Sequence, residues 1–139
     1  MPSVQDDTGS VSVFAVIAAT ILVMFVGVAV DLSGKVHTLQ RAQDIARQAA
    51  RAAGEAAYAP SAIKGEAASV DPARAVQAGQ AYLSAAGISG TVSVVGDTVT
   101  VQTTTTYTPV ILSLAGVGTQ TVTGESTARL ERALQGVQR

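Results

Sequence analysis

The side chains that most often carry out chemistry in proteins are sparse in this sequence. Its single histidine, His37, has Asp31 and Asp44 as the nearest carboxylates. On a helix, Asp44 would lie two turns away, about 10 Å along the axis at 1.5 Å per residue. That separation suits neither an acid–base dyad nor a shared metal ion. We therefore interpret His37 as a solvated interfacial side chain, and we predict no catalytic, cofactor-binding or metal-binding residue.

Serine and threonine are abundant, but they lack an activating base. No histidine follows residue 60, which excludes a serine-nucleophile triad in that part of the chain. Neither glycine motif is a phosphate loop, because Gly27-x-x-x-Asp31 lies inside the apolar run and Gly116-Val117-Gly118 lacks the lysine and the strand–loop–helix frame. The run Thr103–Thr106 fits an ordinary β-strand with exposed threonines better than a glycosylated or ice-binding surface. The sequence thus predicts a protein that is not an enzyme.

The composition narrows the remaining classes of function. A formal net charge of −1 argues against a nucleic-acid partner, because nucleic acids select strongly basic faces. The absence of cysteine excludes disulfide bonds and thiolate metal sites. With 13 glycines and five aromatic residues among 139, the core must be built from small side chains. Such a thin core is marginal by itself, so we expect it to pack on a neighbouring helix or on partner subunits.

A long apolar run near the start must organise the chain. No charged residue occurs from Thr8 to Val30, and these 23 positions can cross a hydrocarbon core of about 30 Å. Two alternatives remain open: a signal peptide cut after Gly27-Val28-Ala29, or a helix buried in a soluble core. The segment before the run has no Lys or Arg, and the polar remainder could hardly cover so many apolar side chains. A membrane anchor over residues 9–30, preceded by a short tail (1–8), is the favoured interpretation.

The helix is expected to continue beyond the membrane as an amphipathic, alanine-rich stalk over residues 31–59. Asp44 with Arg47 or Gln48, and Arg51 with Glu55, are spaced for weak surface pairs on its polar side. The apolar positions recur at steps of three and four, which is a heptad seam that either packs on the chain's own domain or contacts a neighbouring helix. The seam consists of Leu39, Ala42, Ala46, Ala49, Ala53 and Ala56.

The remainder, residues 60–139, predicts a small domain of one helix and a three-stranded antiparallel sheet. Pro60 is expected to end or kink the stalk, and Asp71-Pro72 to begin the second helix, closed by Gly87. Alternating residues predict strands over 91–95, 98–108 and 119–130, the first two joined by a tight Gly96-Asp97 turn. Residues 110–114 form a short helix or a core-crossing loop, and the tail 131–139 is expected to fray. The fold class is therefore α+β.

Three segments of the predicted span and stalk together resemble a known family. They are the opening 9–16 (GSVSVFAV), the exit 27–35 (GVAVDLSGK) and the following segment 39–46 (LQRAQDIA). This pattern is similar to the amino-terminal module of TadE/TadG-like proteins of the Flp (tight adherence) branch of type IV pilus systems. The resemblance covers about a third of the chain, and the rest carries no recognisable motif.

The resemblance implies a membrane-anchored minor pilin or pseudopilin-like assembly component with a pilin-like stalk. It implies a single-pass inner-membrane protein whose carboxy-terminal domain is extracytoplasmic, although Lys35, Arg41 and Arg47 after the span favour the opposite orientation by charge alone. Membrane lipid, other pilin-type proteins and homo-oligomers are the implied partners. Gly9 and Ser10 would flank a processing site, but the fifth residue after Gly9 is Phe14 where cleaved pilins carry glutamate, which favours an uncut anchor. The alternative function is a membrane-tethered extracytoplasmic binding module unrelated to pili.

Overall fold

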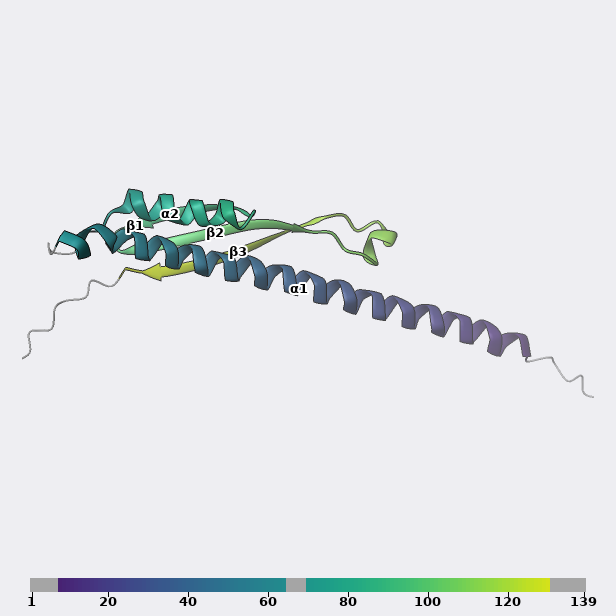
Figure 1. Cartoon of the computed structure of the whole chain (residues 1–139). Helices are drawn as coiled ribbons and strands as arrows, with labels where there is room; N and C mark the ends of the chain where they lie inside the picture. The colour runs from purple at the N-terminus through teal and green to yellow at the C-terminus, as the bar shows by residue number, and fades with distance from the viewer. Residues whose placement is uncertain (1–7, 65–69, 131–139) are drawn as a thin grey trace, which may run out of the picture.

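The computed structural model describes residues 8–64 and 70–130, and one helix dominates it. Helix α1 runs from Thr8 to Lys64 without interruption, and its 57 residues span about 85 Å at 1.5 Å per residue. A small domain lies alongside its carboxy-terminal half, while the amino-terminal half extends away from it (Figure 1). The predicted architecture, a long helix that carries a small domain, and the α+β class are confirmed.

The end of α1 differs from the prediction. Pro60 does not end the helix, because the backbone stays helical for one further turn to Lys64. Proline removes one hydrogen-bond donor from a helix, but near the end of a long helix this costs a single bond to the preceding turn. The expected connector over 60–70 is therefore helical in its first part, and its central part (65–69) lies outside the described residues, as does the predicted frayed tail.

Helix α2 (Pro72–Ala85) begins and ends as its sequence predicts. The Asp71 side chain accepts hydrogen bonds from the N–H groups of Ala73 and Arg74, both at 3.1 Å, so Asp71 is the N-cap and Pro72 the first helical residue. At the other end Gly87 adopts a φ of +67°, the left-handed conformation that lets the chain turn into the first strand.

The sheet contains strands β1 (Ser89–Val95), β2 (Thr98–Tyr107) and β3 (Gln120–Arg129) in the order β1-β2-β3, all antiparallel. The β1–β2 turn consists of Gly96 and Asp97, with Val95 paired to Thr98. Strand β2 pairs with β3 along its full length, but with β1 only as far as Thr104. The β2–β3 end of the sheet is therefore a two-stranded ribbon, which reaches along α1 toward its amino-terminal half (Figure 1).

Both helices cover the same face of this sheet, with α1 over β2 and β3 and α2 over β1. The core between them is made of small side chains from α1 and branched side chains from the strands. Gly79 of α2 marks a close approach, since a Cβ there would lie 2.9 Å from Val92 and 3.4 Å from the Cβ of Ala53. The buried cluster comprises Ala46, Ala49, Ala50, Ala53, Ala57, Ala75, Leu83, Val92, Val99, Val101 and Leu130. Because five of these are in α1, the folded unit includes the second half of the stalk.

The other face of the sheet is uncovered and polar, with threonine the commonest residue. Its exposed side chains include Thr91, Ser93, Gln102, Thr104, Thr106, Thr121, Thr123, Glu125 and Thr127. The β2–β3 connection carries a short 3-10 helix, η1 (Leu112–Ala115). This segment was predicted as a short helix or a core-crossing loop. It is a short helix, and Val110 and Leu114 are exposed rather than placed in the core.

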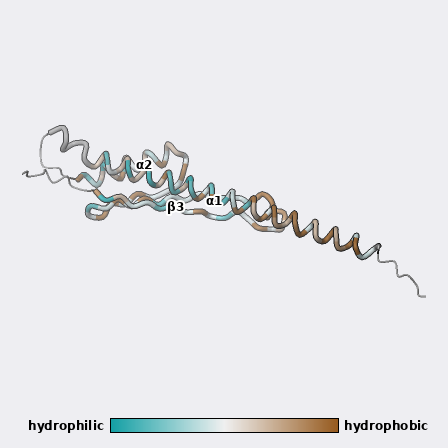
Figure 2. The backbone as a smooth tube through the Cα atoms, turned by 90° about the horizontal axis from the view of Figure 1, so that it is seen from below, coloured by the Kyte–Doolittle hydropathy of each residue, from teal (hydrophilic) through white to brown (hydrophobic). Residues whose placement is uncertain are grey.

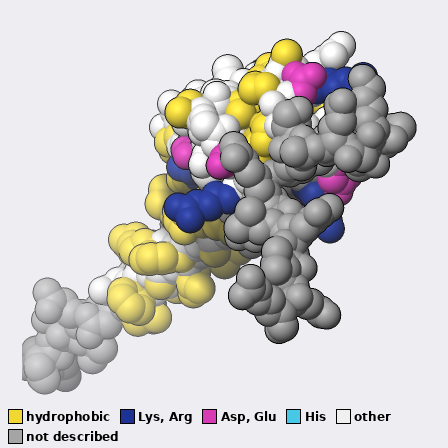
Figure 3. Space-filling model, turned by 90° about the vertical axis from the view of Figure 1, so that its left-hand side faces the viewer, with side chains coloured by type: hydrophobic (Ala, Val, Ile, Leu, Met, Phe, Trp, Pro, Cys, Tyr) yellow, Lys and Arg dark blue, Asp and Glu magenta, His cyan; other side chains and the backbone are white. Residues whose placement is uncertain are grey.

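The apolar half of α1 is uncovered. Phe14 and Phe25 are each 71% exposed, and Gly27 is the one buried residue between Gly9 and Val30. By length and composition this helix can cross a membrane. Figure 2 marks the backbone of this half of α1 as hydrophobic, and Figure 3 shows hydrophobic side chains around the projecting helix. The alternative of a helix buried in a soluble core does not describe this arrangement.

Candidate functional site: the Asp31 anchor

A densely hydrogen-bonded carboxylate lies where the apolar run ends. The Asp31 side chain, only 3% exposed, receives hydrogen bonds from three successive backbone N–H groups of the β2–β3 connection. Val110 donates to Oδ1 at 2.7 Å, Leu112 donates to Oδ2 at 2.7 Å, and Ile111 lies 3.0 Å from Oδ2 and 3.3 Å from Oδ1. The Tyr107 hydroxyl donates to Oδ1 at 3.3 Å. We call this set of five residues the Asp31 anchor.

Two glycines make room for the anchor on α1. Gly27 and Gly34 lie four residues before and three after Asp31, so all three share one face of the helix. A Cβ at Gly27 would overlap Cγ2 of Ile111, and a Cβ at Gly34 would overlap the hydroxyl oxygen of Tyr107 and lie 2.9 Å from its ring. The loop therefore contacts the bare helix backbone, which larger residues at these positions would prevent.

The electrostatics of the anchor favour a charged carboxylate. Burial by itself raises the pKa of Asp31, but the hydrogen bonds from Leu112, Val110, Ile111 and Tyr107 outweigh it and hold this pKa below its usual range. Burial, and then the negative charge and hydrogen bond of Asp31, raise the pKa of Tyr107. The anchor is thus a fixed ionic hydrogen-bond acceptor with a tyrosine that stays protonated at neutral pH.

A second close contact fixes the sheet against α1 about three turns after Asp31. The buried Thr103 hydroxyl lies 2.9 Å from the carbonyl oxygen of Ala42 and 3.3 Å from that of Gly124. A Cβ on Gly124 would lie 2.6–2.7 Å from backbone atoms of Ala42 and Gln43. The helix backbone therefore rests directly on β3, and the anchor holds one end of an extended helix–sheet contact.

The predicted heptad seam lies largely within this contact. Ala42, Ala46, Ala49 and Ala53 are each 0% exposed, while Leu39 and Ala56 are half-buried. Of the two alternatives for the seam, these four residues face the chain's own domain. On the outer side of α1, the predicted pairs Arg47–Asp44 and Arg51–Glu55 occur, each at 3.5 Å and well exposed. Contact of the seam with another subunit stays a prediction.

The other residues singled out from the sequence lie apart from the anchor. Gly9 and Ser10 are exposed in the first turn of α1, and their processing remains a prediction. His37 is exposed on α1. Within the part of the chain that the structure describes, no three His, Cys, Asp or Glu side chains gather into a metal site.

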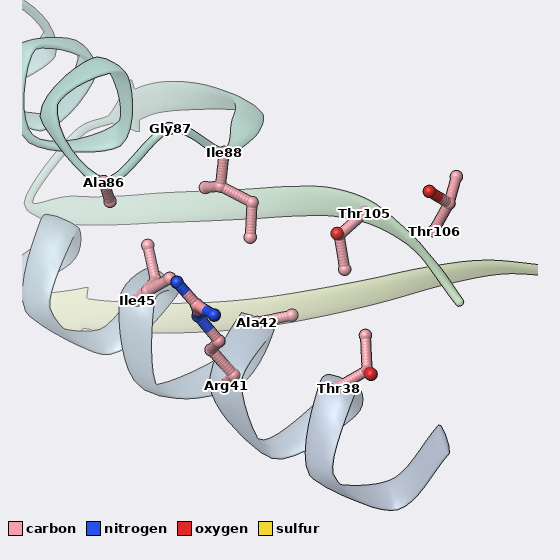
Figure 4. A pocket seen from close by; sticks show the side chains of 9 residues that line it. All are labelled: Thr38, Arg41, Ala42, Ile45, Ala86, Gly87, Ile88, Thr105 and Thr106. Atoms are coloured by element: carbon pink, nitrogen blue, oxygen red, sulfur yellow. The ribbon is translucent and has the colours of Figure 1, made fainter. Parts of the chain in front are cut away.

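A hollow of about 320 Å³ opens beside β2, where β1 no longer pairs with it. Figure 4 shows its lining, with Arg41 and Ile45 from α1 across from Ile88 and with Thr105 at the end of the sheet. The lining offers hydroxyls and one guanidinium but no carboxylate, histidine or thiol. It lacks a pair of groups that could act as general acid and base.

In the sequence Asp31 stands out as a carboxylate near His37 and as part of the exit motif, but neither feature predicts its role in the anchor. The available signal was a carboxylate at the end of the apolar run, flanked on its own helix face by Gly27 and Gly34. A lone charge at the end of an apolar run needs hydrogen-bond donors, and small flanking residues leave room for a backbone to provide them. Which backbone does so, 79 to 81 residues later, depends on the folded topology.

Comparison with protein families gives a match to the amino-terminal part of the chain. Residues 9–62 match the model of the Flp pilus-assembly TadE/G-like family, which confirms the resemblance of the amino-terminal module and supports involvement in Flp pilus assembly. The matched stretch contains the predicted membrane span (9–30), Asp31 with both flanking glycines, and the heptad seam. No curated protein and no solved structure matches the chain.

Proposed function

We propose, on the basis of the TadE/G-like module at residues 9–62, that this chain is a non-enzymatic, membrane-anchored structural or assembly subunit of a Flp (tight adherence) type IV pilus. It would act as a minor pilin or pseudopilin-like component. The structural observation that supports this role is the division of α1 into an uncovered apolar half and a half covered by the chain's own domain. The first half is free for lipid and for other helices.

In this proposal residues 9–30 cross the inner membrane once, and the domain lies on the extracytoplasmic side. Twenty-two helical residues extend about 33 Å, which matches a hydrocarbon core of about 30 Å. The orientation follows the family resemblance, against the charge bias of Lys35, Arg41 and Arg47. Asp31 then lies at the outer border, where its hydrogen bonds attach the domain to the membrane exit of the helix.

Contacts with other pilin-type helices, or with further copies of this chain, would use the uncovered half of α1. The seam residues Ala42, Ala46, Ala49 and Ala53 would be available only if the domain moved away from α1. Residues 9–30 can contact other helices without any movement of the domain. Ala15 and Ala19, four residues apart, provide a small-xxx-small pair of the kind at which membrane helices approach closely.

Genetic complementation tests the proposal in a cell that produces the pilus. Deletion of the chain should abolish or sharply reduce Flp pili counted by electron microscopy, and the wild-type chain should restore them. Ala15→Leu with Ala19→Leu should insert into the membrane but fail to restore pili. The control pair Val16→Leu with Val23→Leu, which enlarges side chains without removing small ones, should restore them. Normal piliation after deletion would contradict the role in pili. Restoration of pili by the chain with Ala15→Leu and Ala19→Leu would exclude the Ala15–Ala19 face of the helix as the contact.

The open sheet face favours the second candidate, a tethered binding module. Its row of exposed threonines, with Gln102 donating to Glu125 at 3.2 Å, is polar and unpartnered within the described residues. A module that used the helix only as a tether should fold without it. Since Ala46, Ala49, Ala50, Ala53 and Ala57 belong to the core, we expect residues 60–139 alone to stay unfolded. A cooperatively unfolding 60–139 fragment, together with normal piliation after deletion, would favour the binding module.

A further inference from the structure

The tip of the β2–β3 connection exposes apolar side chains beside the proposed membrane span. Leu114 is 87% exposed, Val110 65% and Ile111 38%. Single exposed apolar residues are common, but here three lie together on one short loop. Ile111 also joins Leu22, Val23, Val26, Gly27 and Val30 in lining an apolar groove on α1. The loop tip and the span thus form one continuous hydrophobic surface. In Figure 2 the backbones of the two segments adjoin and both carry the brown of hydrophobic residues.

The position of the tip along α1 gives its depth. Ile111 packs on Gly27, which precedes Asp31 by one helical turn, or about 6 Å toward the membrane interior. If residues 9–30 fill the hydrocarbon core, Gly27 lies just inside its outer boundary. The tip therefore reaches the level where headgroups meet acyl chains, a layer of roughly 5–8 Å on each side of a bilayer.

The chemistry of the loop suits that layer. No charged residue occurs between Asp97 and Glu125. An irregular backbone tolerates an apolar setting only where its polar groups are paired, and here many are. The N–H groups of Val110, Ile111 and Leu112 are bonded to Asp31. Turns within the loop bond others, namely those of Leu114 to Ile111, Gly116 to Ser113 and Val117 to Leu112.

We propose that residues 110–114 form a second membrane contact, in which the exposed Val110, Ile111 and Leu114 insert into the outer interface of the lipid bilayer beside the span. This proposal rests on the membrane anchoring proposed above. The Asp31 anchor sets the depth of the tip, and the span together with the tip gives the domain two points of attachment. The occupant is lipid because the surface continues the lipid-facing span and carries no charge or unpaired recognition group that a specific protein partner would read.

The test uses the full chain in phosphatidylcholine vesicles, with and without bromine on the acyl chains near the headgroup. Bromine quenches nearby tryptophan, and the chain has no tryptophan of its own, so single-tryptophan variants report one site each. Leu114→Trp reports the tip and Phe25→Trp reports the span. Val95→Trp is the matched control, because Val95 is 77% exposed at the β1–β2 turn, at the opposite end of the sheet from the tip.

We expect brominated lipid to quench Leu114→Trp nearly as much as Phe25→Trp, with a blue-shifted emission in both, and to leave Val95→Trp unchanged. Quenching of Phe25→Trp alone, with Leu114→Trp behaving like Val95→Trp, would overturn the second membrane contact but leave the membrane span intact. Absence of quenching in Phe25→Trp would overturn the proposed membrane span, and the second contact with it. A blue-shifted but unquenched Leu114→Trp that reverts when the protein is diluted in lipid would assign the tip to a second copy, against a lipid contact.

Discussion

The contact between the α1 backbone and β3 at Gly124 can be tested by adding one methyl group. In Gly124→Ala the new Cβ would lie 2.6 Å from the carbonyl carbon of Ala42 and 2.7 Å from both its oxygen and the nitrogen of Gln43. These are backbone atoms of a helix and cannot rotate away. Helix and sheet must therefore separate by about 0.8 Å to reach an ordinary contact of 3.4 Å.

The separation has two energetic consequences. Overpacking of a tightly packed core costs about 1–3 kcal/mol. The Thr103 hydroxyl, now 2.9 Å from the Ala42 oxygen, would move beyond hydrogen-bonding distance and lose about 1 kcal/mol more. Together the free energy of unfolding should fall by about 2–4 kcal/mol. Since about 1.4 kcal/mol corresponds to a factor of ten, the unfolding equilibrium constant should rise by roughly 30- to 700-fold.

Urea unfolding of the full chain in detergent micelles measures this change. Tyrosine fluorescence is a suitable signal, because Tyr82 of α2 donates a hydrogen bond to Gln48 of α1 and so reports on the packed domain. The matched control is Gly118→Ala, where a Cβ would meet no atom within 4 Å; its midpoint should stay close to that of the wild type. Equal midpoints for Gly124→Ala and Gly118→Ala would refute the direct helix–sheet contact.

Three further predictions concern the buried polar contacts. Thr103→Val keeps the shape but removes the hydroxyl, and should lower the free energy of unfolding by about 1 kcal/mol in the same urea titration. Asp31→Asn should speed amide hydrogen exchange at residues 110–112, because an amide offers one acceptor where the carboxylate offers two, whereas the exposed Asp44→Asn should leave these rates unchanged. The pKa of Asp31 is lower in the folded state than the unfolded value of about 3.9, so its charged form stabilises the fold above that pH. Protection of the same amides from exchange should therefore fall as the pH drops below about 4 and through the folded pKa. Protection that does not change in acid would contradict a charged Asp31 anchor.

Much of the fold follows from local sequence signals. The apolar run, the Asp71-Pro72 start of α2, the Gly96-Asp97 turn and the alternation over β2 each depend on neighbouring residues, and the structure confirms them. Strand ends differ by one or two residues, as hydrogen-bond pairing decides them. That Pro60 ends α1 was wrong, because a proline signal predicts a break without knowledge of the helix on either side, and a kink at Pro60 stays a prediction.

The anchor was not predictable in the same way. Its carboxylate, its glycines and its N–H donors come from stretches about 80 residues apart, and backbone donors leave no trace in residue type. The heptad seam illustrates the related limit. Its spacing predicts a buried face, but the identity of the covering surface depends on the three-dimensional arrangement, in which the chain's own sheet and α2 cover it.

Site-specific photo-cross-linking in cells that assemble the pilus tests the central claim most directly. A photoreactive residue in place of Phe14, on the uncovered span, should yield adducts with pilin-type or pilus-assembly proteins identifiable by mass spectrometry. The same residue in place of Thr104, on the open sheet face, should give few such adducts. A chain that forms no adduct with any pilus component from the span, while it crosslinks to unrelated envelope proteins from the sheet, would contradict the assignment to pilus assembly.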